Sequence, residues 1–225
     1  MDAPAARVPL TSSQRTVLSI ATVLGTMMYA IDSTIVNVAL PHMQGNLQAS
    51  QDQAAWILTS YIVVSAIMTP LAGWLGTRFG LRPIMLASVA GFTAGSMLCG
   101  IATDLGQIVA FRALQGVSGA ALVPLAQVVL LQEYPREQHA RVTALWGMGV
   151  LLGPVIGPTL GGWLTDELSW RWAFFINLPF GVVAFLGMFA TMRRGDGDAR
   201  RPFDLTGFVL LSMAIGLFQL MMDRG

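Results

Sequence analysis

The chain has 225 residues, of which 54% are hydrophobic and only 11% are charged, and its formal net charge is +1. Soluble domains carry about 25% charged residues. This composition and the mean hydropathy of +0.63 therefore exclude a soluble globular protein and indicate a polytopic membrane protein. The single cysteine, Cys99, excludes a disulfide framework, and no set of residues has the spacing of a metal site.

Seven apolar segments follow one another along the chain. Each is close to the roughly 20 residues that a tilted helix needs to cross the hydrocarbon core, and each is too long and too uniformly apolar for a strand of a membrane barrel. The loops between them are too short to hold a catalytic domain, so we do not expect an enzyme. The segments cover residues 16–40, 54–76, 83–102, 107–131, 142–164, 173–192 and 205–222.

The segments predict an all-α membrane protein. A cytoplasmic tail over residues 1–15 would precede a six-helix bundle over residues 16–192. A cytoplasmic linker over residues 193–204, rich in Arg, Gly and Asp, would then lead to a seventh helix over residues 205–225, where the sequence stops. This arrangement suggests the first part of a larger protein whose second bundle is missing.

The basic residues predict the orientation of the bundle, and all 13 are arginine. If the N-terminus is cytoplasmic, ten of the 13 lie on the cytoplasmic side, and only Arg112, Arg171 and Arg224 do not. The opposite orientation would reverse this ratio, so the positive-inside rule favours a cytoplasmic N-terminus.

Two charged residues lie inside predicted spans, Asp32 in the first and Arg112 in the fourth. A carboxylate at membrane depth costs about 2.5–3.5 kcal/mol on insertion scales, so such a residue usually faces a polar cavity and has a function there. A carboxylate whose exposure changes can take up and release a proton, as proton coupling requires. The alternative is a static ion pair that joins the first and fourth helices.

The fifth span has an unusual pattern of glycines and prolines. Glycines four residues apart lie on one face of a helix and let another helix approach closely, whereas prolines remove backbone donors and kink the helix. The pattern predicts a bendable seam on one side of the bundle. Its residues are Gly149, Gly153, Pro154, Gly157, Pro158, Gly161 and Gly162.

An internal repeat is visible between residues 73–82 and residues 162–171, where a Gly-Trp-Leu string and a final Arg coincide without gaps. The first copy ends the second helix on the inside, and the second copy ends the fifth helix on the outside. The two halves of the bundle would therefore be inverted three-helix repeats (3+3), as in secondary transporters.

Polar and aromatic side chains inside the spans are candidates for a substrate cavity. Each of them could equally serve helix packing or lie at the membrane interface. The candidates are Tyr29, Asn37, Gln115 and Gln127.

These motifs together resemble the N-terminal half of a major facilitator superfamily transporter, and more narrowly the fourteen-helix drug:proton antiporter branch (EmrB/QacA-like). The last segment resembles the extra seventh helix of that branch. The matching strings are residues 32–41, 73–82, 112–119, 153–162 and 170–179.

The resemblance implies proton-coupled efflux of hydrophobic or cationic compounds across the bacterial cytoplasmic (inner) membrane by alternating access. Asp32 and Arg112 match positions implicated in coupling. The loop after the second helix matches a gating loop, although Thr77 stands where the superfamily usually has Asp, so the charge relay of that gate is incomplete. The gating residues would be Gly73, Arg78, Gly80 and Arg82.

The expected partners are the lipid bilayer, protons, an amphipathic small molecule and a C-terminal bundle of the same chain. Whether a periplasmic adaptor protein also binds stays open. No cofactor, metal or nucleic acid is expected. Two other functions also stay open on the same fold: export of one specific metabolite or antibiotic, and a non-transporting membrane receptor or scaffold. Asp32 and the glycines of the fifth helix disfavour the scaffold.

Overall fold

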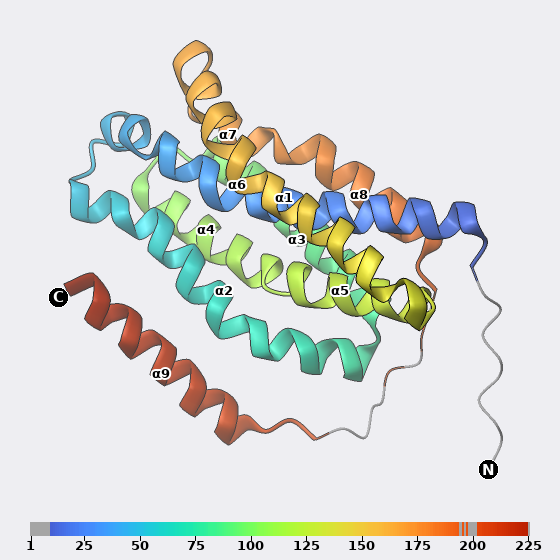
Figure 1. Cartoon of the computed structure of the whole chain (residues 1–225). Coiled ribbons are helices and arrows are strands. Elements are labelled where there is room, and N and C mark those ends of the chain that lie inside the picture. The colour runs from blue at the N-terminus through green and yellow to red at the C-terminus, as the bar shows by residue number, and fades with distance from the viewer. Residues whose placement is uncertain (1–9, 194, 196, 198–201, 225) are drawn as a thin grey trace.

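The computed structural model describes residues 10–193, 195, 197 and 202–224. Over these residues the chain is helical without strands, and its long helices lie side by side in a bundle (Figure 1). The helices are α1 (Ser12–Asn46), α2 (Gln51–Phe79), α3 (Leu81–Ile101), α4 (Leu105–Gly119), α5 (Leu122–Glu133), α6 (His139–Glu167), α7 (Trp172–Phe175), α8 (Asn177–Thr191) and α9 (Leu205–Arg224), with a short 3-10 turn η1 (Arg136–Gln138) before α6.

Within the described part of the chain, six helical stretches are long and apolar enough to cross a membrane, and a shorter apolar stretch lies in α9. The predicted all-α fold of six membrane helices plus a seventh is therefore confirmed. Several helices extend beyond the predicted spans, because hydropathy detects only their apolar middle. The first runs over Ser12–Asn46 rather than 16–40.

Polar caps mark the beginning of α1, α2 and α4. Thr11 and Gln14 form a capping box at the start of α1, and the carboxylate of Asp104 accepts a hydrogen bond of 2.9 Å from the backbone N–H of Gln107 in the first turn of α4. Such side chains satisfy backbone donors that have no partner inside the helix. These helices can therefore begin immediately after short loops.

Two of the six spans are broken into two helices, and proline explains both breaks. Proline has no N–H to bond the carbonyl four residues earlier, and its ring collides with that carbonyl. Pro124 thereby interrupts the fourth span at Ala120, between α4 and α5. Pro179 likewise removes the bond to the carbonyl of Phe175, and the sixth span breaks at Ile176 between α7 and α8.

The helix packing follows the inverted repeat. The first span, α1, packs chiefly against α6 and α8, which belong to the fifth and sixth spans. The fourth span, through α4, packs chiefly against α2 and α3, the second and third spans. Exchanging the two halves of the bundle converts one set of contacts into the other, which is the relation expected of two three-helix repeats.

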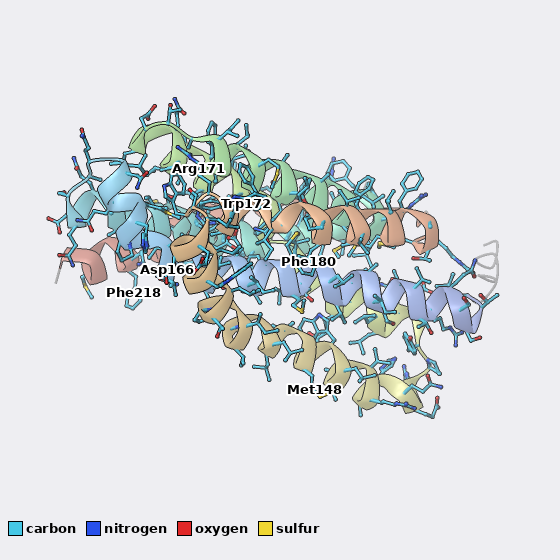
Figure 2. All side chains as sticks on the ribbon, turned by 90° about the horizontal axis from the view of Figure 1, so that it is seen from above. Met148, Asp166, Arg171, Trp172, Phe180 and Phe218 are labelled. Carbon is cyan, nitrogen blue, oxygen red and sulfur yellow. The ribbon has the colours of Figure 1, made fainter. Side chains whose placement is uncertain are left out.

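Successive spans alternate in direction, so the N-terminus, the turn from α2 to α3, the connection from α5 to α6 and the end of α8 lie at one end of the bundle (Figure 1). Asp166 and Arg171 lie near the opposite end, whereas Met148 and Phe180 lie closer to the middle (Figure 2). The charged residues Asp166 and Arg171 thus lie where they can reach the polar surface of a bilayer.

The seventh helix, α9, lies outside the bundle beside α2 (Figure 1). The ring of Phe203, just before α9, contacts the ring of Trp74 in α2, with centroids 4.7 Å apart. Most described side chains of α9 are apolar and exposed, so a bilayer would surround this helix. They include Leu205, Val209, Leu210, Met213, Leu217 and Phe218.

Candidate functional site

An ion pair lies in the interior of the bundle. Asp32 of α1 and Arg112 of α4 are 0% and 1% exposed, and Arg112 Nη1 donates to Asp32 Oδ2 over 2.6 Å. Charged side chains are almost never fully buried unless they are paired. The structure thus brings together the two intramembrane charges that the sequence singled out.

Two amides complete the surroundings of the carboxylate. Asp32 Oδ1 accepts hydrogen bonds from Gln115 Nε2 at 2.8 Å and from Asn177 Nδ2 at 2.9 Å. Together with Arg112, three donors face the two oxygens. An ionised carboxylate only accepts hydrogen bonds, so this arrangement matches the deprotonated form of Asp32.

The guanidinium of Arg112 is also held by three other groups. Its Nη1 donates to Gln115 Oε1 at 2.7 Å, and its Nε donates to the backbone carbonyl of Ile57 in α2 at 3.3 Å. Its central carbon lies 4.0 Å from the centroid of the Tyr61 ring, within the range of a cation–π contact. The charge of Arg112 therefore links α2 and α4 to α1.

The network continues from Asn177 toward α3 and α7. Asn177 Nδ2 also donates to Ser96 Oγ at 2.8 Å, and that hydroxyl donates to the carbonyl of Phe174 at 2.9 Å. Neither Asn177 nor Ser96 was a candidate in the sequence analysis. The available signal was an amide inside an apolar span, the same feature that pointed to Gln115.

Four glycines of α6 lie directly against α1. Three of them approach α1 residues that come just before or just after Asp32 in the sequence. A Cβ at Gly153 would lie 2.5 Å from the Cβ of Ala30, and one at Gly157 would overlap the hydroxyl of Thr34. Gly161 approaches Ile35 in the same way, and Gly149 approaches Val23 closer to the N-terminal end. Residues Pro154 and Pro158 are exposed, and Gly162 faces open space.

The turn from α2 to α3 contains the predicted gating residues. Gly80 has φ +91°, a conformation that suits glycine. Arg82 Nη2 donates to the carbonyl of Phe189 at 2.9 Å, and its guanidinium lies 5.2 Å from the centroid of that ring. The turn is thereby tied to the end of α8.

Arg78 lies one turn earlier, with its guanidinium 5.1 Å from the centroid of the Trp74 ring. Gly73 is exposed on α2 and has open space where a Cβ would lie. The predicted gating residues are therefore close in sequence but differ in their surroundings. Their role in gating stays a prediction.

The four candidates for a substrate cavity do not lie together. Gln115 belongs to the buried network, and the hydroxyl of Tyr29 forms a hydrogen bond of 3.2 Å with Ser65 Oγ. Asn37 is exposed and donates to the carbonyl of Ser33 within α1, while Gln127 is half-buried on α5. A role in substrate binding stays a prediction for each of them.

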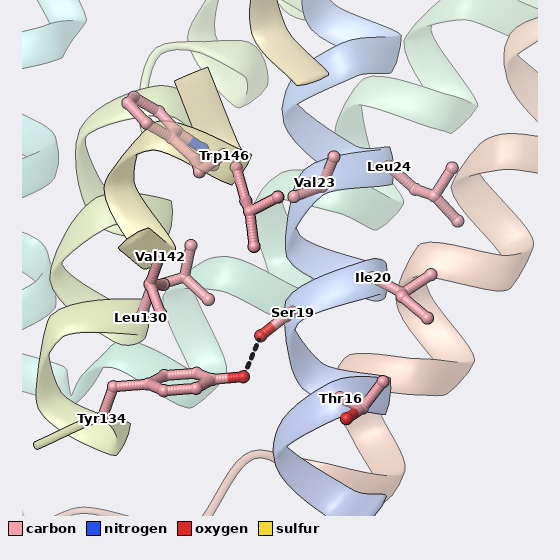
Figure 3. Close-up of a pocket in the computed structure, with 10 residues that line it drawn as sticks. Thr16, Ser19, Ile20, Val23, Leu24, Leu130, Tyr134, Val142 and Trp146 are labelled. Carbon is pink, nitrogen blue, oxygen red and sulfur yellow. Dashed lines mark hydrogen bonds between the residues drawn. The ribbon is translucent and has the colours of Figure 1, made fainter. Parts of the chain in front are cut away.

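A cavity of about 370 Å³ lies elsewhere, between the N-terminal part of α1, the end of α5 and the beginning of α6. Its polar groups include Ser19 Oγ and Tyr134 Oη, which form a hydrogen bond of 2.8 Å across it (Figure 3). Its other lining residues are mostly apolar. They include Ile20, Val23, Leu24, Leu130, Val142 and Trp146.

The sequence profile described as Major Facilitator Superfamily matches residues 22–222. The chain belongs to this superfamily. It is therefore a multi-pass membrane protein of a transporter family rather than an enzyme. Among its relatives it is 42% identical over 218 residues to "Multidrug export protein EmrB" of Escherichia coli (strain K12), covering 96% of this chain and 43% of that protein.

A second relative, "Fatty acid resistance protein FarB" of Neisseria gonorrhoeae, is 41% identical over 203 residues, covering 90% of this chain and 40% of that protein. The chain thus spans less than half the length of these relatives. Among solved structures, it is similar to a peptide transporter POT in complex with sulfate, with a TM-score of 0.74 at 16% identity, over 97% of this chain and 48% of that one. This likeness concerns the fold alone.

Proposed function

We propose that this chain forms the N-terminal bundle of a proton-coupled exporter of hydrophobic or cationic compounds. The exporter works by alternating access in the inner membrane, with its N-terminus in the cytoplasm. The observation that carries the proposal is the carboxylate of Asp32, which is fully buried yet held by donors from α4 and α8. A carboxylate in this position is the group in the described bundle best suited to carry a proton.

The position of Asp32 supports coupling between protonation and movement. On α1, Asp32 lies beside the residues that contact Gly153 and Gly157 of α6. Small residues at a helix interface let the backbones approach closely. A shift of α6 along α1 would therefore change the access of water to the carboxylate. A substrate that favours one arrangement would then compete with the proton.

The substrate class is suggested by the relatives and by the cavity. One relative is named for multidrug export and another for fatty acid resistance, and both names point to amphipathic compounds. The apolar cavity, with its Ser19–Tyr134 hydrogen bond, offers the same mixture of apolar surface and a few polar groups. It lies at the end of the bundle that we assign to the cytoplasm.

The test is transport by the purified transporter that contains this chain, reconstituted in liposomes. A pH gradient is imposed, and the movement of a lipophilic cation and of a fatty acid is followed for the wild type and for Asp32→Asn. The matched control is Asp52→Asn, since Asp52 is an exposed acid in the first turn of α2. We expect Asp32→Asn to abolish gradient-driven transport while substrate binding persists, and Asp52→Asn to transport normally.

Two results would contradict the proposal. If Asp32→Asn transports as well as the wild type, Asp32 has a structural role in the ion pair only. If the wild type moves neither compound under any gradient, an exporter of one specific compound or a non-transporting protein becomes the better interpretation.

A further inference from the structure

One oxygen of the buried network has no hydrogen-bond donor. In the described part of the chain, Asn177 Oδ1 is buried and accepts no hydrogen bond, whereas Nδ2 of the same amide donates twice, to Asp32 and to Ser96. The whole side chain is 1% exposed. Buried polar groups are rarely left without a partner, and each exception calls for an explanation.

The neighbouring carboxylate has the opposite requirement when it is protonated. Each of its three described partners is a donor, and a protonated Asp32 adds an O–H that needs an acceptor. Gln115 Oε1 already accepts from Arg112 Nη1 at 2.7 Å and from Cys99 Sγ at 3.8 Å, so both of its lone pairs have a donor. Asn177 Oδ1 is the amide oxygen beside the carboxylate whose capacity to accept is unused.

We propose that Asn177 is a positioning residue that responds to the protonation state of Asp32, an inference that rests on the proposed role of Asp32 in coupling. A half-turn about the Cβ–Cγ bond exchanges Nδ2 and Oδ1, which have nearly the same size. Before the turn, Nδ2 donates to the carboxylate. After the turn, Oδ1 accepts the O–H of the acid, and the proton, which comes from water, stays on Asp32.

The same half-turn changes the bonding of Ser96. The hydroxyl of Ser96 now accepts from Asn177 and donates to the carbonyl of Phe174. Once Oδ1 faces it, this hydroxyl turns to donate to Asn177, and the carbonyl of Phe174 loses its donor. Phe174 lies just before the break at Ile176 that separates α7 from α8. One proton on α1 therefore changes the hydrogen bonds of α3 and of the segment just before the break in the sixth span.

The test is infrared difference spectroscopy between acidic and neutral pH on the purified transporter in liposomes, with and without ¹³C-labelled asparagine. We expect a carboxylic-acid C=O band that is lost in Asp32→Ala. We also expect an asparagine C=O band that moves to lower frequency over the same pH range, because its oxygen gains a donor. That amide band should disappear in Asn177→Leu and persist in Asn46→Leu, whose exposed amide lies at the end of α1.

The outcomes separate the two proposals. An Asp32 band without any change of the Asn177 amide would overturn the role of Asn177 and leave the proposed function intact. The absence of an Asp32 band at every pH would overturn both. If Asn177→Leu does not fold, the wild type still decides, since its labelled amide band either follows the Asp32 band through the titration or does not.

Discussion

Asp32 and Arg112 are each tolerated inside the bundle only because the other is there. Removing both charges from water costs several kcal/mol per ion, and their attraction offsets this cost only when the geometry is good and the remaining donors and acceptors are satisfied. Here the separation is 2.6 Å, and Gln115, Asn177 and the carbonyl of Ile57 provide the additional hydrogen bonds.

Single and double substitutions of the pair therefore differ in their effect. We expect Asp32→Asn and Arg112→Gln each to destabilise the protein by about 3–5 kcal/mol, because each leaves a buried charge without its partner. The double variant should be destabilised by clearly less than the sum, since it buries no charge. Thermal unfolding in detergent measures the effect, with Arg136→Gln on the exposed turn η1 as the control. Strictly additive losses would show that the pair is not coupled.

The charged residues of the buried network can be predicted from the sequence more easily than its neutral residues. A charge inside an apolar span is rare, so Asp32 and Arg112 stand out. Ser96 and Asn177 do not, because small polar side chains occur in most membrane helices, and a pattern in one helix does not reveal which side chain of another helix it meets. The same limit explains why Gln115 was assigned to a cavity rather than to the ion pair.

Among the elements, α6 shows most clearly how a glycine pattern determines packing. Its glycines at spacing four let the backbone of α6 lie directly on α1, so even one methyl group would collide with α1. The prolines of the same helix are exposed, and α6 continues through both of them. Bending at this seam remains a prediction.

Alanine substitutions on two faces of α6 test this packing. Gly153→Ala should destabilise the protein by about 1–3 kcal/mol, because its Cβ would lie 2.5 Å from the Cβ of Ala30 and 2.9 Å from a backbone carbon of Ala30. Gly162→Ala, with open space around it, should be neutral or stabilise the helix by up to about 1 kcal/mol. Melting temperatures of the two variants provide the measurement. Equal effects would mean that α6 does not rest on α1 as described.

Element boundaries show what hydropathy can and cannot predict. The apolar spans were found, because a length of about 20 apolar residues is a strong signal. The breaks at Ala120 and Ile176 were not, since they depend on Pro124 and Pro179 near helix starts, while Pro154 and Pro158 leave α6 continuous. Whether a proline ends a helix depends on how neighbouring helices support the freed carbonyl.

Two arginine-containing turns of the bundle lie at one end, whereas Arg171 lies near the other. The turn from α2 to α3 and the turn η1 lie at the same end as the N-terminus, while the beginning of α2 lies at the other (Figure 1). The positive-inside rule assigns the arginine-rich end to the cytoplasm. The proposed export depends on this assignment, because it places the cavity at the cytoplasmic end of the bundle.

The orientation can be measured with a membrane-impermeant maleimide in intact cells, because the chain's own cysteine, Cys99, is 0% exposed and should give little background. We expect Asp52→Cys, at the exposed start of α2, to be labelled without permeabilisation. Glu137→Cys, on the exposed turn η1 at the opposite end, should be labelled only after permeabilisation. Labelling of the wild-type transporter measures the background from any other cysteine. The reverse pattern would place the N-terminus outside, and the cavity of Figure 3 would then lie at the end of the bundle away from the cytoplasm, contrary to the proposed export.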